Sequence, residues 1–532
     1  MHWSRKQIAV RAGVAAALAV AAGAVFALGR ESSPFPSQPD DSPTVRIGNP
    51  IPVASFALRD AYLNNNNRFV VLAYEGLTLN DRSGRELPAL AERWEALDGA
   101  HRWRFHLRSG VVFHDGTPFS AADVRRSWGT ALRVGPGHAS YPYMLEPIRG
   151  ARAFAAGEAR SIEGVRIVDD STIDVLLDRP LVFLPALLSL PQAAIAGARS
   201  TDRRPIGTGP WRWVSGQPRT GDEIWLARFR RYWGAQPKLD SVVIRTVPDS
   251  LQLAAFQAGW IDFTNLVVPG ARAALRRSER MGYLDGVTTG LFRLTIDFRQ
   301  PHLADPRVRE ALCLAVNVEK LSVIFGGAIG RQARGPVPPQ MGGSRGPAAC
   351  AFDPARARTL LQEAGWPAAR PLRFWAPAGE QGEFPPELGR LIANSLSSVG
   401  FDVEYHQDPG AWDAMAAKQA DVVLESWYPD YADPDAFLYP LFHSSNAGSA
   451  SNPGWFRDAV TDSLIDASRA ALDSAERVRL QREAEARIVS LRPNVFLWFS
   501  HMPTAYAVRL KGWQPTTYTF RYQELELAAR KR

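Results

Sequence analysis

The chain of 532 residues holds 62 basic and 54 acidic residues, giving a formal net charge of +8, and 46% of its residues are hydrophobic. This composition is ordinary for a globular protein, and the length exceeds the size at which single hydrophobic cores stop growing, so two or more lobes are expected. The charge falls to +4 without residues 1–30, and the other basic residues are dispersed along the chain. We therefore predict no nucleic-acid partner.

The first thirty residues predict export from the cytoplasm. Basic residues precede an apolar run from Ala12 to Leu28, which is the layout of a signal peptide, and small residues would allow cleavage after Ala27. The run is also long enough for an uncleaved membrane anchor, since a span takes about 20 apolar residues. We expect a signal peptide or N-terminal anchor at 1–30, a flexible leader at 31–43, and a periplasmic or other extracytoplasmic location.

Strand and helix patterns alternate along the rest of the chain and predict a mixed α/β architecture. Trp103, Phe105 and Leu107 alternate with polar residues, so they are expected on one face of a strand. A second strand with the same alternation is expected just after Gly400, which is placed to end a helix.

Two further helices carry start signals of the same kind. Asp305 followed by Pro306, and Asp353 followed by Pro354, are each an N-cap residue with proline in the first turn. Gly365 is placed to end the second of these helices.

Motifs for catalysis or metal binding find little support. Ser344 lies in a G-x-S-x-G pattern, but the segment is rich in Gly and Pro and no apolar strand leads into it, as a nucleophile elbow would require. Histidines do not cluster at ligand spacing. Cys313 and Cys350 could pair in an oxidising compartment or stay separate thiols. We predict no catalytic residue, no metal site and no cofactor.

A series of segments resembles, in content and order, the family 5 extracellular solute-binding proteins. These segments are Leu87–Trp94, Trp103–Val111, Phe113–Val124, Gly207–Trp211, Tyr232–Gly234, Asp305–Leu312, Phe352–Pro354 and Trp427–Phe437. The resemblance implies a bilobed fold like that of the type II periplasmic binding proteins, with a hinge between two lobes. It also implies a substrate-binding component of an ABC importer, which captures peptides or peptide-like solutes by hinge closure and presents them to permease subunits, as a monomer.

The resemblance further implies how the chain divides between the lobes. The expected division is lobe I at 44–289 with an inserted subdomain at roughly 65–185, lobe II at 290–492, and a return to lobe I with a C-terminal tail at 493–532. Crossings between the lobes are expected near Thr288–Leu294 and Pro493–Ser500.

The expected ligand-binding residues lie just after an apolar strand, in the segment that begins at Trp427. In peptide-binding members, the acidic residue matching Asp430 pairs with the α-ammonium group of the ligand, and the residue matching Trp427 lines the cleft in some members. Tyr428 completes the predicted set. The alternative is that Asp430 caps a turn, and Asp433 and Asp435 are expected to cap the helix that begins near Pro434.

Other residues in the segments that resemble the family are expected to have structural roles. His114 and Asp115 are expected to build a turn with Gly116, in which the aspartate accepts backbone N–H bonds. Gly207 and Gly209 are expected in a strand connection, with a hinge as the alternative.

Several alternatives stay open at this stage. The same family takes up nickel complexes, haem, sugars and modified peptides, so the ligand class is a prediction. A membrane-tethered sensor or chaperone would share the fold, and a secreted hydrolase using Ser344 is the enzyme alternative.

Overall fold

The computed structural model describes residues 43–528 except for short segments. The segments left out are 51, 54, 59–66, 82–83, 136–141, 217–222, 265–277, 280, 325–329, 344–350, 367–369, 378–385 and 513–520. Residues 1–42, with the predicted signal peptide or anchor and nearly all of the leader, also lie outside the described residues. Within the described part of the chain, no helix has the length and apolarity that a membrane span requires.

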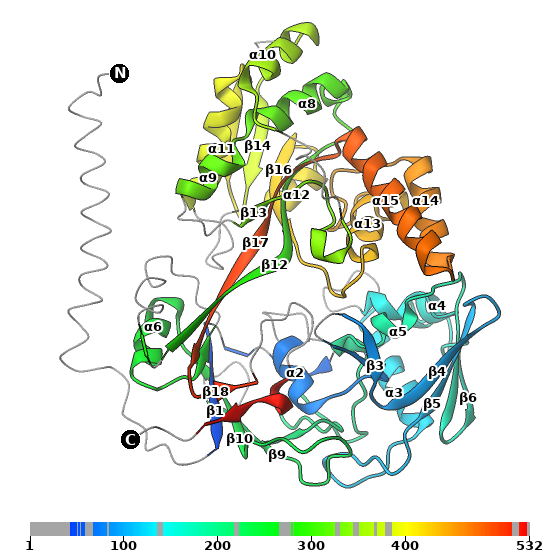
Figure 1. Cartoon of the computed structure of the whole chain (residues 1–532). Coiled ribbons are helices and arrows are strands. Elements are labelled where there is room, and N and C mark those ends of the chain that lie inside the picture. Colours follow the sequence, from blue (N-terminus) through cyan, green and yellow to red (C-terminus); the bar gives the residue numbers. More distant parts are fainter. Residues whose placement is uncertain are drawn as a thin grey trace.

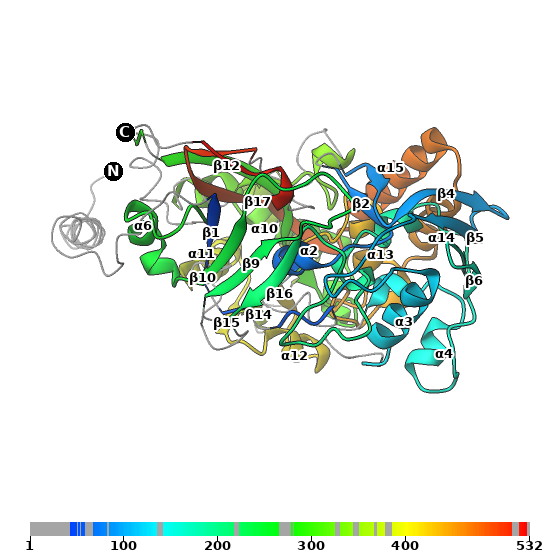
Figure 2. The ribbon, with the colours of Figure 1, turned by 90° about the horizontal axis from the view of Figure 1, so that it is seen from below.

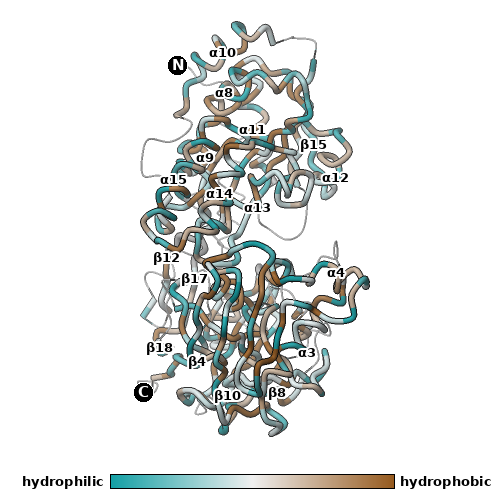
Figure 3. Tube along the Cα trace, turned by 90° about the vertical axis from the view of Figure 1, so that its right-hand side faces the viewer, coloured by the Kyte–Doolittle hydropathy of each residue, from teal (hydrophilic) through white to brown (hydrophobic). Residues whose placement is uncertain are grey.

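Two long antiparallel strands join the two lobes (Figures 1 and 3). Strand β12 (Met281–Ile296) pairs with β17 (Asn494–Ala507) along nearly its whole length, from Met281 opposite Ala507 to Thr295 opposite Asn494. Both predicted crossing segments fall on this pair. The bilobed α/β fold is confirmed, whereas the lobe boundaries stay a prediction.

Lobe I is built on strands that continue the sheet from β17. In sheet order these are β11 (Phe263–Thr264), β1 (Thr44–Asn49), β10 (Ser241–Thr246), β9 (Ile224–Arg228) and β8 (Trp211–Ser215). Helices α2 (Asn67–Ala73) and α6 (Asp249–Gln257) and the small sheet of β18 (Leu510–Lys511) and β19 (Glu526–Leu527) complete it. Chain segments from both ends of the sequence therefore share one core, in which Val45, Trp211 and Tyr522 are buried together.

A separate unit is inserted into lobe I. The chain leaves at Glu75 and returns at Ile195, and these two residues pair in an isolated bridge. We call residues 76–195 the inserted unit; Figure 2 shows its sheet and helices beside the β1–β10 part of lobe I. It contains β2 (Thr78–Asn80), β3 (Glu86–Pro88), β4 (Ala91–Leu97), β5 (Arg102–Leu107), β6 (Val165–Asp169), β7 (Thr172–Leu176), α3 (Ala121–Leu132), α4 (Ala151–Ala155) and α5 (Leu184–Leu187).

The core of the inserted unit follows from the alternation read in the sequence. Trp103, Phe105 and Leu107 are buried on one face of β5, as predicted. Helix α3 packs Trp128 into the same core, where the indole N–H donates to the carbonyl of Ala193 at 2.8 Å.

Lobe II surrounds the other end of the shared sheet. Its strands are β14 (Leu372–Ala376), β15 (Val403–Gln407) and β16 (Val422–Trp427), with β13 (Arg331–Gln332) on β17. Its helices are α8 (Pro306–Ala315), α9 (Val318–Ile324), α10 (Pro354–Glu363), α11 (Pro386–Ser398), α12 (Ala411–Ala416), α13 (Asp435–Phe442), α14 (Ala459–Ala470) and α15 (Ser474–Leu491). Short 3-10 helices elsewhere span Tyr143–Leu145, Pro191–Ala193, Pro301–Leu303, Pro339–Met341, Ser444–Asn446 and Tyr522–Glu524.

The helix boundaries predicted in lobe II are confirmed. The side chain of Asp305 accepts the N–H of Arg307 at the start of α8, and that of Asp353 accepts the N–H of Arg356 at the start of α10. Gly365 follows α10 at a φ of +67°, a conformation that glycine adopts without a Cβ penalty.

Of the two cysteines and the candidate nucleophile Ser344, the structure describes only Cys313. Cys313, buried in α8, is disulfide-bonded. Cys350, the other cysteine of the sequence, lies outside the described residues, as does Ser344.

Gly207 and Gly209 lead into β8 and pass against the end of α2, which supports their assignment to a strand connection. A Cβ on Gly207 would lie 2.0 Å from the carbonyl oxygen of Ala73, and one on Gly209 would lie 2.7 Å from the carbonyl carbon of the same residue. Glycine is therefore needed here for close backbone approach.

We predict that Gly207→Ala lowers the free energy of unfolding by about 1–3 kcal/mol, because the added methyl group overlaps a backbone carbonyl. Gly129→Ala is the control: it lies within α3, and its Cβ would meet Phe154 at an ordinary 3.6 Å. That variant should gain about 0.5–1 kcal/mol from the higher helix propensity of alanine. Urea denaturation of both variants checks this, and equal effects would contradict it.

Candidate functional site

The predicted ligand-binding residues lie at the carboxyl end of β16, a central strand of lobe II. Val422, Val423 and Leu424 are fully buried. The strand pairs in parallel with β14 and antiparallel with β12, where Trp427 lies opposite Leu291. β14 pairs only with Val422 and Val423 at the start of the strand, so the pairing with β12 up to Trp427 fixes where the strand ends and the following segment begins.

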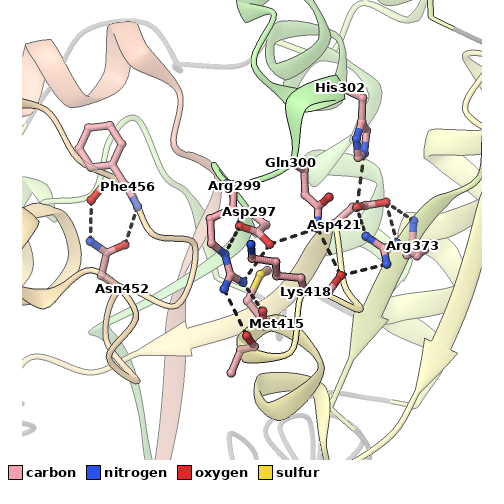
Figure 4. Close-up of polar contacts among 11 residues, drawn as sticks. Asp297, Arg299, Gln300, His302, Arg373, Met415, Lys418, Asp421, Asn452 and Phe456 are labelled. Atoms are coloured by element: carbon pink, nitrogen blue, oxygen red, sulfur yellow. Dashed lines mark hydrogen bonds and ion pairs between the residues drawn. The ribbon is translucent and has the colours of Figure 1, made fainter.

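Ion pairs hold the opposite end of β16 (Figure 4). Asp421 is fully buried. Its Oδ1 lies 2.6 Å from Arg373 Nη2 and 3.3 Å from His302 Nε2. Burial raises the pKa of Asp421, but the contacts with His302 and Arg373 outweigh it and bring the pKa to about 2. A second pair, Asp297 with Arg299 at 2.8 Å, lies beside it. The strand is thus anchored away from the candidate site.

Trp427 ends β16 and ties it to the next helix. Its indole N–H donates to the carbonyl of Ala436 at 2.8 Å, and its half-buried ring packs against a hydrophobic cluster that includes Phe437. The residue therefore fixes the path of the segment between β16 and α13.

Tyr428 lies against the strand that crosses between the lobes. Its side chain is 37% exposed, and a Cβ on Gly290 of β12 would lie 2.3 Å from Cε1 of its ring. The ring also meets Phe292 edge-on, with centroids 6.5 Å apart. The structure thus places Tyr428 between the candidate site and the crossing.

Asp430 lies where lobe II meets the inserted unit. Its side chain is partly buried, and its Oδ2 accepts a hydrogen bond from the hydroxyl of Tyr143. Tyr143 belongs to the inserted unit and is 287 positions away in sequence. Sequence reasoning missed Tyr143, because no local pattern links it to the segment after β16.

Asp433 and Asp435 differ in role. Asp433 accepts the N–H of Asp435 at 2.8 Å and so caps the start of α13, as predicted. The prediction is wrong for Asp435, which is 1% exposed and instead pairs with Arg469 at 2.8 Å and accepts the hydroxyl of Tyr431 at 2.8 Å. Its position in the first turn of α13 turns its carboxylate toward α14, where Arg469 lies.

His114 and Asp115 form the predicted turn. Asp115 accepts the N–H of Thr117 at 3.1 Å, and Gly116 adopts a φ of +86°. The His114 ring contacts the carbonyl of Gly209 at 3.0 Å, and burial lowers its pKa to about 4, so it is neutral at physiological pH.

A half-buried carboxylate not identified from the sequence joins two of the segments that resemble the family. Glu75 accepts hydrogen bonds from Thr208 at 2.9 Å, Tyr232 at 2.7 Å and Trp233 at 2.8 Å. Burial raises its pKa to about 7, although these three donors and the charge of Arg108 act in the opposite direction. With three protein donors at the base of the inserted unit, Glu75 is a structural junction. Among the described residues, no group of His, Cys, Asp and Glu side chains is placed to hold a metal ion.

Comparison with known families identifies the class of protein. The sequence profile of the bacterial extracellular solute-binding proteins, family 5, matches residues 87–449. The chain belongs to this family. As a family 5 member it is a solute-binding protein of an ABC importer and not an enzyme. Proteins of this family bind solutes in the extracellular space or in the periplasm.

Similar proteins differ in the ligands that their names state. The di/tripeptide-binding protein 2 of Pseudomonas aeruginosa is 28% identical over 429 residues, covering 76% of this chain and 79% of that protein. The haem-binding protein A of Haemophilus influenzae is also 28% identical, over 472 residues, covering 81% and 82%.

Solved structures of other proteins share the fold of this chain. The periplasmic binding protein DppA of Helicobacter pylori, in complex with the peptide STSA, superposes with a TM-score of 0.74 at 23% identity, covering 91% of this chain and 98% of that one. HbpA2 of Haemophilus parasuis gives a TM-score of 0.78 at 20% identity, covering 91% and 100%. The predicted fold of the periplasmic-binding-protein type is thus confirmed.

The half-buried carboxylate of Glu75 predicts a pH dependence of stability. Because its folded pKa of about 7 lies above the ordinary 4.5, the folded state binds the proton more tightly. The free energy of unfolding should therefore fall as the pH rises from about 4.5 to about 7, by about 3 kcal/mol at most.

The variant Glu75→Gln should lack this fall, and Glu319→Gln, at an exposed position of α9, should keep it. Urea denaturation at several pH values between 5 and 8 measures the difference. Parallel pH profiles for wild type and Glu75→Gln would contradict the assignment.

Proposed function

We propose that this protein captures peptides or peptide-like solutes outside the cytoplasmic membrane, holds the ligand's α-ammonium group on Asp430, and delivers the ligand to the permease subunits of an ABC importer. The observation that carries the proposal is the position of Asp430. Its carboxylate follows the rigidly anchored strand β16 and lies where lobe II meets the inserted unit, in contact with Tyr143.

The chemistry of a partly buried carboxylate suits this role. A charge-assisted hydrogen bond to an ammonium group is stronger than a neutral one, and every unmodified peptide carries that group whatever its side chains. Asp430 would therefore contribute affinity for peptides without selecting among their amino-acid sequences. The relatives and structures whose names state a peptide ligand support this class, and the exposed part of the Tyr428 ring offers apolar contact beside it.

Trp427 has a supporting place in the proposal. Because its indole N–H is bonded to Ala436, its contribution to ligand binding would come from the face and edge of the ring. Closure of the lobes about β12 and β17 would enclose the ligand, and the closed shape would be the one that the permease recognises. The protein would reach its compartment through the signal peptide or anchor at 1–30 and act as a monomer.

Native mass spectrometry of protein purified from an exported preparation tests the proposal through co-purified ligands. We expect peptides on the wild type and a loss of about 10- to 100-fold in occupancy or affinity in Asp430→Asn, because a hydrogen bond to a charged group is worth about 1.5–3 kcal/mol.

The matched control is Asp413→Asn, which removes one carboxylate from the exposed face of α12 in the same lobe. This variant should retain the peptides. A haem or other non-peptide mass on the wild type, or peptides equally retained by Asp430→Asn, would contradict the proposal.

A further inference from the structure

Asp430 and the two residues that follow it each contact a different segment of the inserted unit. Asp430 accepts the hydroxyl of Tyr143, Tyr431 stacks on Phe183, and Ala432 meets Gly84. The contacting segments are far apart in the inserted unit, so its folded surface as a whole meets residues 430–432. We call these three residues the ligand loop.

The contact with Phe183 is the most deeply buried of the three. The rings of Phe183 and Tyr431 stack with centroids 5.6 Å apart and planes at 19°, and the side chains are 3% and 4% exposed. The guanidinium groups of Arg469 and Arg477 lie 5.3 Å and 4.8 Å from the centre of the Phe183 ring. Phe183, which belongs to the core of the inserted unit, is thus contacted by three lobe II side chains, and a buried stack of this kind fixes the position of Tyr431.

Backbone and charge contacts beside Phe183 extend this interface. The N–H of Val182 donates to the carbonyl of Arg469 at 3.0 Å, and Arg179 pairs with Asp466 at 3.4 Å. The inserted unit therefore docks on α14 as well as on the ligand loop.

The contact at Gly84 leaves no room for a side chain between the two surfaces. Gly84 lies in the turn between β2 and β3 at a φ of +87°, and a Cβ there would lie 2.1 Å from the Cβ of Ala432. Any larger residue at this position would push the ligand loop away or move the turn.

We propose that the inserted unit positions the ligand site by holding the ligand loop, so that Asp430 is fixed in place for the ligand's ammonium group. In this proposal Tyr143, Phe183 and Gly84 do not bind the ligand themselves but act through the ligand loop. The inference rests on the proposed function of Asp430. The physical reason is preorganisation, because the ligand loop lies beyond the last paired residue of β16, and a charged hydrogen bond loses strength when its acceptor is free to move.

The variants that test this change the contacts one at a time. Tyr143→Phe removes only the hydroxyl that Asp430 accepts. Gly84→Ala displaces the loop through Ala432, and Gly157→Ala is its matched control, because Gly157 has a similar φ of +79° in the same unit but nothing within 4 Å of its added Cβ. Strain from the positive φ is thus common to both glycine variants.

The readout is the preference for a free amine. A pool of di-, tri- and tetrapeptides, prepared in free-amine and in N-acetylated form, is offered to each variant, and native mass spectrometry gives the ratio of the two forms bound. We expect wild type and Gly157→Ala to prefer the free amine, and Tyr143→Phe and Gly84→Ala to lose about tenfold of that preference. Thermal unfolding identifies any variant that fails to fold. If Gly84→Ala fails to fold, the result for Tyr143→Phe decides the test by itself.

The outcomes separate this inference from the proposed function. If Asp430→Asn abolishes the preference while Tyr143→Phe and Gly84→Ala keep it, the inserted unit does not position the site and the inference is overturned. Equal weakening of both peptide forms by Tyr143→Phe would show a merely structural role and would also overturn it. If the wild type shows no preference for the free amine, the proposed role of Asp430 fails first.

Discussion

The pairing of β12 with β17 is the constraint on which the rest of the structure depends. The strands have 16 and 14 residues, so at about 3.3 Å per residue they extend about 50 Å and about 45 Å. They belong to the core sheets of both lobes, joining β16 on one side to β11 and β1 on the other. The register shifts between Val287 and Leu291, and this irregularity lies close to Gly290. Each lobe keeps its own core while the sheet stays continuous.

The segment after β16 links that crossing to the rest of the site. Tyr428 packs on Gly290 of β12, and two residues later Asp430 begins the ligand loop held by the inserted unit. A ligand bound at Asp430 would therefore contact a segment that packs against both the crossing strands and the inserted unit. If Asp430 holds the ligand as proposed, this packing would couple ligand binding to the relative position of the lobes.

Local signals in the sequence predicted what depends on local contacts. The caps Asp305 and Asp353 and the turn at His114 and Asp115 depend on backbone groups within a few residues, so composition and spacing were enough. The alternation in β5 likewise depends only on which face is buried. The family resemblance added the bilobed fold, which no single pattern in the chain specifies.

Contacts between distant segments could not be predicted in this way. The junction at Glu75 needs three donors from two later segments, and Tyr143 meets Asp430 only because the inserted unit docks on lobe II. Asp435 has the sequence context of a cap, yet its carboxylate instead pairs with Arg469, a partly buried arginine 34 positions later. In each case the deciding partner is brought in by tertiary packing.

The most direct test of the account is a crystal structure of the protein with a bound tripeptide that has a free amino terminus. The account predicts the peptide's ammonium nitrogen within about 3 Å of a carboxylate oxygen of Asp430. A peptide whose ammonium group is held by another acceptor, with Asp430 out of hydrogen-bond reach, would contradict it.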